Sequence, residues 1–327
     1  MGTLFKDKVV IVTGSGQGIG RAIAIAFGAE GARVVTNNRK PGSTGYIVLP
    51  PELHDALPAE KRREFDGIID EIKGDAESTA RTIIEAGGLA TPVYGDLAIE
   101  EDCKKIVDAA AKAYGTVDIV INVAGAFGGG ALEEMSLADW DRVCNVKPRG
   151  YFSVVKYAVP YMVEKGWGRI INSTSKAFMG DIVKMANYCT ANAGSVGLTQ
   201  ALACEFFADG ITANAFAPFA RTRASYGGDY IGAMGDSVSG EDDFPKAADT
   251  PDPEALCPFI EYLCTDAAKD VTGTVFTLAG NQVLMHQFPI IAKSITKAGS
   301  DYWTVEELAQ IAPGTLFRGY NNITAYQ

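Results

Sequence analysis

The sequence predicts a single α/β domain built on a doubly wound, seven-stranded parallel sheet, with an inserted helical segment and a C-terminal extension. Short apolar runs alternate with longer helical windows along the chain. A glycine-rich turn follows the first of these runs directly. The chain has 327 residues, 47% of them hydrophobic, which suits one large core.

The predicted strands are apolar runs of the length and continuous hydrophobicity typical of buried parallel strands. They are Val9–Thr13, Arg33–Thr36, Thr91–Tyr94, Ile119–Val123, Arg169–Asn172, Thr212–Ala215 and Thr274–Leu278. The helices predicted between them include Ala22–Glu30, Glu101–Tyr114, Asp139–Lys165 and Tyr188–Ala208. We expect the main domain to cover residues 1–280 and the C-terminal extension to cover residues 281–327.

The first strand leads into a turn that suits a dinucleotide. Residues Val9–Gly20 read VVIVTGSGQGIG, and a helical window follows. Glycines permit a tight turn and let backbone N–H groups approach a pyrophosphate, which the positive end of the helix faces. This order predicts a Rossmann-type nucleotide site rather than a strand–helix turn without a ligand. We expect the dinucleotide to contact Gly14, Ser15, Gln17, Gly18, Ile19 and Gly20 in this turn.

The second strand ends at the position that reads the adenosine ribose. An acidic residue there normally accepts hydrogen bonds from the ribose hydroxyls of NAD, but this chain has Asn38, followed by Arg39 and Lys40. A guanidinium can pair with the extra phosphate of NADP. We therefore expect NAD(P)(H) as cofactor with a lean towards NADP(H), bound by Asn38 and Arg39. The alternative is that Arg39 and Lys40 form a solvated turn.

Two segments interrupt the alternation of strands and helices. Residues 40–74 form an insertion, in which a stripe of Phe65, Ile68, Ile69 and Ile72 predicts a helix. The insertion is either a cover on the sheet edge or a flap or partner surface near the adenosine end. Residues 224–253 are rich in Gly, Asp and Ser, which is typical of a mobile lid over a substrate or of a disordered segment without a role.

Composition excludes several classes of function. The net charge is −11, so nucleic acid and anionic membranes are not expected partners. We find no apolar run near the roughly 20 residues of a spanning helix and no export leader, so we expect a cytoplasmic protein. The six cysteines show no C-x-x-C spacing, as expected of reduced thiols. The two histidines are not at a metal spacing, so we expect no metal site and no histidine base.

Three motifs together resemble the short-chain dehydrogenase/reductase family over almost the whole chain. They are the TGxxxGxG spacing at Thr13–Gly20, the NVAG at Asn122–Gly125, and Ser175 thirteen residues before Tyr188. The strings NAFAPFARTR and WTVEELAQIAP look closest to the branch that includes the (3R)-hydroxyacyl-CoA dehydrogenase domain of peroxisomal multifunctional proteins. That likeness implies a β-hydroxyacyl-CoA thioester as the favoured substrate class.

The resemblance also implies roles for individual residues. Ser175 would hydrogen-bond the substrate oxygen, Tyr188 would donate or accept the proton, and Asn145 would hold a helix and a water chain. Asp96 would lie near the adenine ring and Thr222 near the nicotinamide carboxamide. The remaining cofactor contacts that we expect are Leu97, Asn122, Ala124, Gly125 and Pro218.

The chain departs from the family four residues after the tyrosine, where Asn192 replaces a lysine. A phenol, with an ordinary pKa near 10, needs nearby cations to act near neutral pH. An amide can still bind ribose hydroxyls, but it cannot supply the charge. Another lysine could reach in, and the candidates are Lys147, Lys176 and Lys184, although we expect each to be a solvated surface amine.

Two functional hypotheses follow. The first is an NAD(P)-dependent oxidoreductase that interconverts a secondary alcohol and a ketone, with Ser175, Tyr188, Asn145 and Asn192 in the catalytic site. The second is a catalytically weak or inactive pseudoenzyme subunit that partners an active paralogue, which Val123 and Phe219 favour slightly because the family commonly has other residues there. By likeness, we expect a homo-oligomer or hetero-oligomer formed through the helices at 139–165 and 188–208.

Overall fold

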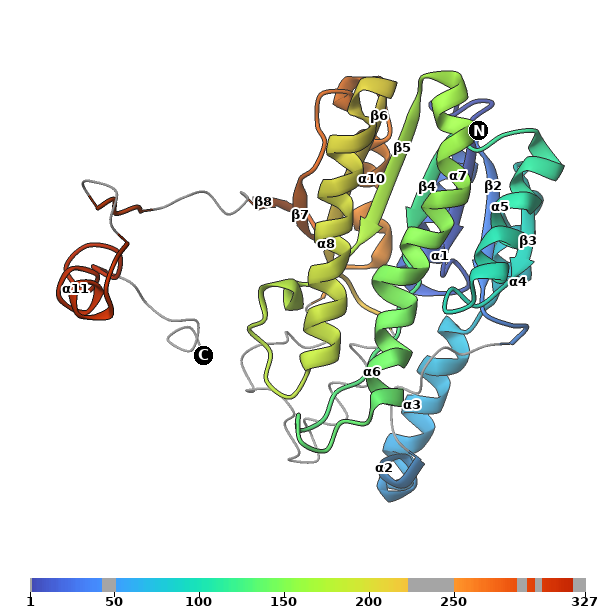
Figure 1. The fold of residues 1–327 in the computed structure, drawn as a ribbon. Coiled ribbons are helices and arrows are strands. Elements are labelled where there is room, and N and C mark those ends of the chain that lie inside the picture. Colours follow the sequence, from blue (N-terminus) through green and yellow to red (C-terminus); the bar gives the residue numbers. More distant parts are fainter. Residues whose placement is uncertain (1, 43–50, 223–249, 287–292, 298–301, 320–327) are drawn as a thin grey trace. The chain divides into compact units, whose positions relative to one another are not determined.

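The computed structural model describes residues 2–42, 51–222, 250–286, 293–297 and 302–319 (Figure 1). The chain divides into two compact units, Met1–His286 and Gln287–Gln327. The first unit holds the sheet and the candidate site. The second contains helix α11 (Val305–Ile311), which begins with a reciprocal capping box between Thr304 and Glu307.

The sheet of the first unit has eight strands in the order β3-β2-β1-β4-β5-β6-β7-β8. The seven predicted strands are present and parallel. They are β1 (Val9–Thr13), β2 (Arg33–Asn38), β3 (Leu89–Tyr94), β4 (Ile119–Asn122), β5 (Gly168–Ser173), β6 (Ile211–Phe219) and β7 (Val275–Ala279). An eighth strand, β8 (Gln282–His286), pairs antiparallel with β7 and is absent from the predicted set. It falls in the stretch predicted to be the C-terminal extension.

Helices cover both faces of the sheet, and β1 shows why. Its residues Val9 and Ile11 belong to one buried cluster, while Val10 and Val12 belong to the other, as the period-two alternation of a strand requires. Helices α5 (Glu100–Tyr114), α7 (Tyr151–Lys165) and α8 (Ala186–Phe206) pack on the first face. Helices α1 (Gly18–Ala29), α4 (Ala76–Glu85) and α10 (Cys257–Leu263) pack on the second (Figure 1). The doubly wound fold is confirmed.

The helix predicted over 139–165 is broken. It consists of α6 (Leu137–Cys144), a π-helical turn at Asn145–Gly150, and α7. Inside the turn Lys147 is extended, with φ −129° and ψ 132°. The cause is Pro148, because the proline ring disfavours the helical conformation of the residue before it and removes a backbone donor. This break directs the Lys147 side chain into the protein, where it is buried.

The insertion contains two helices, α2 (Pro51–Ala56) and α3 (Ala59–Ile72). Helix α3 carries the predicted apolar stripe, and Phe65 on that stripe is buried. Most of the predicted lid, residues 224–249, lies outside the described residues.

Candidate active site

The strand order reverses between β1 and β4, and ligands of open α/β sheets bind beyond the carboxyl ends of the strands at such a point. A cavity of about 200 Å³ lies there. Its lining comes from the turn after β1, the end of β2, the segments after β2, β3 and β4, and the π-helical turn between α6 and α7. The lining residues are Gly14, Gly16, Gln17, Asn37, Asn38, Arg39, Gly95, Asp96, Leu97, Val123, Ala124, Gly125 and Val146.

The glycine turn between β1 and α1 is a cradle that side chains would fill. Gly14 has φ +67°, and a Cβ atom on it would lie 2.6 Å from the Ala124 backbone. A Cβ on Gly20 would lie 2.3 Å from the Gly14 carbonyl oxygen. The turn therefore brings bare backbone to the start of the twelve-residue helix α1, where N–H groups and the helix dipole favour an anion. These residues fit the pyrophosphate of a dinucleotide.

The loop after β4 is fixed to this turn by a buried side chain. The hydroxyl of Thr13 accepts hydrogen bonds from the backbone N–H groups of Val123 at 3.1 Å and Ala124 at 3.4 Å. It also lies 3.3 Å from the Asn122 carboxamide oxygen, to which it donates. Asn122 continues the buried chain to Asn172 at 3.0 Å. These buried hydrogen bonds therefore fix the position of the loop after β4 relative to the glycine turn, and both segments line the cavity.

The end of β2 is committed to holding helix α4. The Asn38 carboxamide accepts a hydrogen bond from the Ala76 N–H at 2.8 Å and donates to the Lys40 carbonyl at 3.0 Å. The carboxylate of Asp75 accepts from Ser78 N–H and from the Tyr94 hydroxyl. Desolvation opposes, but these hydrogen bonds outweigh it and lower the pKa of Asp75. Arg39 lines the cavity. The positively charged Arg39 and the negatively charged Asp75 therefore both lie near the end of β2.

The structure brings eight of the predicted cofactor residues to the cavity: Gly14, Gln17, Asn38, Arg39, Asp96, Leu97, Ala124 and Gly125. The others support it or stand beside it. Ser15 is fully buried and its hydroxyl accepts from the Asn37 N–H at 2.8 Å. Gly18, Ile19 and Gly20 begin α1, and Thr222 lies beside Gly18. Asn122 is buried, and Pro218 lies in β6. The cavity also includes Asn37, whose role the sequence did not predict.

Ser175 and Tyr188 meet at the carboxyl end of β5 and the start of α8. Burial raises the pKa of the Tyr188 phenol, and hydrogen bonds to the side chains of Ser175 and Asn192 oppose that rise without cancelling it. The Phe127 ring packs edge-on against the Tyr188 ring, with centroids 5.1 Å apart. The predicted pair is therefore joined, and the Phe127 ring packs on the tyrosine of the pair.

Asn192 is fully buried and its amide has a defined orientation. Its Nδ2 donates to the Tyr188 backbone carbonyl at 2.8 Å. Its Oδ1 accepts from the Lys147 amine at 3.4 Å. The same amine donates to the Ser173 hydroxyl at 2.9 Å.

Lys147 corrects the expectation that all three candidate lysines are solvated. It is buried, with 6% of its surface exposed, and desolvation lowers its pKa to about 7. Lys176 is exposed and lies 3.5 Å from Asp181. Lys184 is exposed as well, at the rim of a second cavity. The spacing along a predicted helix could not reveal Lys147, because the inward turn depends on the break at Pro148.

The observed contact of Asn145 does not join it to Ser175, Tyr188 or Asn192. Its side-chain oxygen accepts from Arg149 at 3.4 Å, on the exposed side of the π-helical turn. In the described structure, the residue of this segment that touches Ser173 and Asn192 is Lys147.

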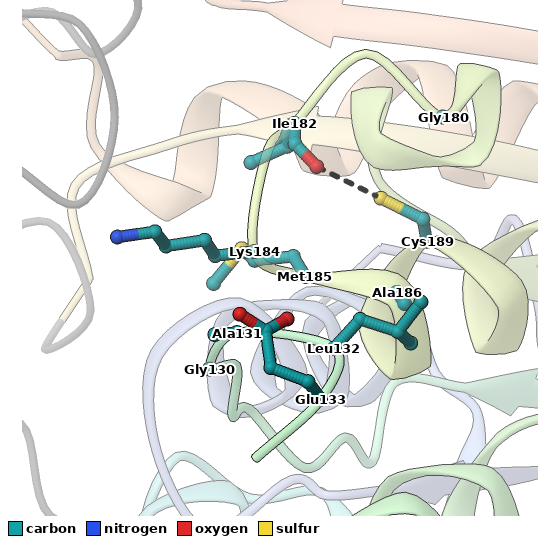
Figure 2. Close-up of a pocket in the computed structure, with 10 residues that line it drawn as sticks. All are labelled: Gly130, Ala131, Leu132, Glu133, Gly180, Ile182, Lys184, Met185, Ala186 and Cys189. Carbon is teal, nitrogen blue, oxygen red and sulfur yellow. Dashed lines mark hydrogen bonds between the residues drawn. The ribbon is translucent and has the colours of Figure 1, made fainter. Parts of the chain in front are cut away.

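A second cavity, of about 390 Å³, lies between the loops that follow β4 and β5 (Figure 2). Leu132 and Met185 give it apolar walls, and Glu133 and Lys184 add charges. Figure 2 shows the Lys184 side chain extending away from Cys189, whose thiol contacts the Ile182 carbonyl at 3.8 Å. Cys189, one of the residues that line this cavity, directly follows Tyr188 in α8.

In the described part of the chain, no group of three or more His, Cys, Asp or Glu side chains could hold a metal ion. No described helix combines the length and apolar character needed to cross a bilayer.

Comparison with known proteins matches residues 8–46 and 66–223 to the short chain dehydrogenase family. The chain is 33% identical over 275 residues to the peroxisomal hydratase-dehydrogenase-epimerase of Saccharomyces cerevisiae, a match that covers 84% of this chain and 26% of that protein. It is 33% identical over 279 residues to the peroxisomal multifunctional enzyme A of Dictyostelium discoideum, covering 85% of this chain and 54% of that one. The chain thus spans about a quarter and about half of these two relatives.

A third relative is similar in length. The hydroxyacyl-CoA dehydrogenase ChsB1 of Mycobacterium tuberculosis is 30% identical over 314 residues, 94% of this chain and 87% of that protein. Among solved structures, a short chain dehydrogenase from Mycobacterium avium superposes with a TM-score of 0.72 at 28% identity, covering 96% of each chain.

Proposed function

The chain belongs to the short chain dehydrogenase family, and from that premise we propose that it is an NAD(P)-dependent oxidoreductase interconverting a secondary alcohol and a ketone. The observation that carries the proposal is the placement of the Tyr188 phenol. It hydrogen-bonds Ser175, which follows β5, and Asn192 of α8. The cavity at the glycine cradle lies at the same carboxyl edge of the sheet. A proton-transferring group and a site suited to a dinucleotide therefore share this edge.

Each residue of the site has a chemical task in this proposal. When bound, a nicotinamide would supply hydride exchange at the substrate carbon. In the oxidation direction the Tyr188 phenolate accepts the hydroxyl proton of the substrate, and in the reduction direction the phenol returns a proton to the carbonyl oxygen. The Ser175 hydroxyl hydrogen-bonds the same oxygen. Asn192 orients the phenol.

We propose a β-hydroxyacyl thioester, such as an acyl-CoA, as the substrate class. The name of the M. tuberculosis relative supports this class. The second cavity also supports it, because the apolar side chains of Leu132 and Met185 in its lining suit an acyl chain, and Cys189 of that lining directly follows Tyr188.

For the cofactor we propose NADP(H) over NAD(H). Arg39 in the cavity lining favours the additional phosphate, and the Asn38 amide does not repel it. The Asp75 carboxylate on the neighbouring turn acts in the opposite direction. Replacing Arg39 by Ala should weaken NADPH binding more than NADH binding, measured by calorimetric titration, and an equal loss for both would reverse the preference.

We further propose that the protein acts in the cytoplasm as a homo-oligomer or hetero-oligomer. The six cysteines are free thiols, in keeping with a reducing compartment. Helix α7 exposes Phe152 and Val163, apolar side chains that association would cover.

The second candidate is a subunit without activity of its own, which partners an active paralogue. It is favoured by the uncharged Asn192 and by Val123 in the cavity wall. This candidate predicts no turnover of any substrate, whether or not the dinucleotide binds.

One experiment separates the two candidates. The purified protein is given NADPH or NADH with a panel of 3-oxoacyl thioesters and simple ketones, and the nicotinamide absorbance is followed. The oxidoreductase should turn over at least one of them. Replacing Tyr188 by Phe should lower that rate about 10²- to 10⁴-fold, the usual worth of a positioned acid or base. Binding of NADPH without any turnover would favour the scaffold.

A further inference from the structure

The Lys147 amine occupies a position unusual for a lysine: it is buried among neutral polar groups. Its contacts are the Ser173 hydroxyl at 2.9 Å and the Asn192 Oδ1 at 3.4 Å, with the Tyr151 ring centroid 5.5 Å away. Desolvation is the cause of its pKa shift, and no carboxylate in the described structure offsets it. Buried cations ordinarily have an anionic partner. A site that buries an amine without one is suited to an anion that forms only during a reaction.

The hydrogen bonds around the amine have a defined direction. Lys147 donates to Ser173, Ser173 lies 2.9 Å from the Tyr151 hydroxyl, and Tyr151 donates to the Ala124 carbonyl at 2.8 Å. Since the carbonyl can only accept, Ser173 donates to Tyr151 in this chain and its oxygen is left to accept from the amine. The hydrogen bonds through Ser173 therefore hold the Lys147 amine in position without placing a negative charge beside it.

The second branch leads to the catalytic phenol. Asn192 presents its oxygen to the amine and its Nδ2 to Tyr188, where it donates to the backbone carbonyl and also hydrogen-bonds the phenol. A positive charge at the amine polarises this amide so that its N–H end becomes a stronger donor. A negative charge on the phenol would therefore be stabilised from Lys147 through Asn192.

We propose that Lys147 is a positioning residue that supplies, through Asn192, the positive charge that residue 192 itself lacks. The proposal rests on the proposed role of Tyr188 as proton donor and acceptor. The positive charge would be on Lys147 in the turn between α6 and α7, and the Asn192 amide, which lies next to Tyr188, would transmit its effect to the phenol.

The charge state of Lys147 gives the proposal a pH dependence. Desolvation lowers the pKa of its amine to about 7. Among the described residues, the titratable groups facing it are phenols: Tyr151 from α7 and, through Asn192, Tyr188 from α8. Burial raises the pKa of both phenols, so they are neutral where the amine titrates. The charge that assists Tyr188 is therefore present below about pH 7 and lost above it.

The first test needs no turnover. Ionisation of Tyr188 is followed by tyrosinate absorbance at alkaline pH, as the difference from Tyr188→Phe in the same background. The wild type and Lys147→Gln should titrate alike, because the amine is already neutral there. Lys147→Arg fixes a charge at this position and should move the Tyr188 transition to lower pH, corresponding to an acidity about tenfold higher.

A second variant guards against failure of the buried arginine to fold. Lys147→Asn combined with Asn192→Lys moves the amine to position 192 and should lower the Tyr188 transition as well. Lys176→Met is the matched control, since that amine is exposed and lies beside Asp181. Folding of each variant is checked by circular dichroism. A folded Lys147→Arg protein with an unmoved Tyr188 transition would overturn the proposal.

The kinetic test is the pH profile of ketone reduction. The wild-type rate should fall as pH rises through about 7 and approach the rate of Lys147→Gln, whose profile lacks this step. Lys147→Arg should keep the higher rate on both sides. The same step in Lys147→Gln would contradict the proposal. If the wild type turns over no substrate, the proposed function fails, while the tyrosinate titration still decides whether position 147 acts on Tyr188.

Discussion

Gly194 faces Pro148 so closely that a Cβ atom on the glycine would lie 2.8 Å from the proline Cγ. The contact joins α8 to the turn between α6 and α7. Because the Tyr188 phenol is near the start of α8 and Lys147 precedes the proline, the spacing of these two segments sets the geometry of the site.

Replacing Gly194 by Ala should separate the segments. Elsewhere in a helix this change gains up to about 1 kcal/mol in helix propensity, but here overpacking costs about 1–3 kcal/mol. Gly197 in the same helix is the control, since a Cβ atom there would meet nothing within 4 Å. Denaturant unfolding should show Gly194→Ala less stable than Gly197→Ala. Equal stability would mean that the turn moves away freely.

Lys147→Met should change how stability depends on pH. The amine has a pKa of about 7 in the folded protein and 10.5 ordinarily, so between these values the unfolded chain binds the additional proton. Wild-type stability should therefore rise with pH across this window relative to the variant, by up to about 1.4 kcal/mol per pH unit. Below about pH 7 the burial cost is present in full, and the variant gains most. Urea unfolding of both proteins at several pH values measures this, and a constant difference would contradict it.

Gly14→Ala should weaken dinucleotide binding. The residue needs φ +67°, and its Cβ atom would lie 2.6 Å from the backbone of Ala124. The left-handed conformation alone costs roughly 1–2 kcal/mol in a residue with a side chain, and the displaced backbone would narrow the cavity. We expect at least tenfold weaker NADPH binding by calorimetric titration. Gly67→Ala in α3, where a Cβ atom would meet nothing within 4 Å, should bind normally.

The alcohol-oxidation rate should rise with pH beyond neutrality. Oxidation requires the Tyr188 phenolate, and the pKa of that phenol is raised by burial, so the reactive form increases as pH rises. Asn192→Lys places a cation beside the phenol and should increase the rate at neutral pH. Steady-state rates from neutral to alkaline pH test both statements, and a profile flat over that range would contradict the role of Tyr188.

The parallel strands could be predicted from the sequence because each is buried on both faces, so every residue of a run such as Val9–Thr13 carries the signal. Strand β8 has no such signal, since Val283, Leu284 and Met285 are exposed and its antiparallel pairing depends on β7 alone. The helix break was missed because hydrophobic periodicity continues through Pro148.

The candidate site was predictable where local order determines it. The glycine turn follows its strand directly, and Ser175 and Tyr188 lie at a spacing that one loop closes. The sequence offers Lys147 as a source of charge but predicts a solvated amine, because sequence separation gives no direction to a side chain. Its burial depends on three distant contacts, Ser173, Asn192 and the Gly194–Pro148 approach.

The insertion leaves and rejoins the domain at almost one point. The Gly42 N–H donates to the Asp75 carboxylate at 3.2 Å, and the Gln17 side chain donates to the Gly74 carbonyl at 3.1 Å. An excursion whose two ends are already tied together can change length at little entropic expense, since loop closure depends only logarithmically on residue number. We therefore expect that residues 43–73 can be replaced by a short linker or by an inserted domain without a change in the conformation of the glycine turn.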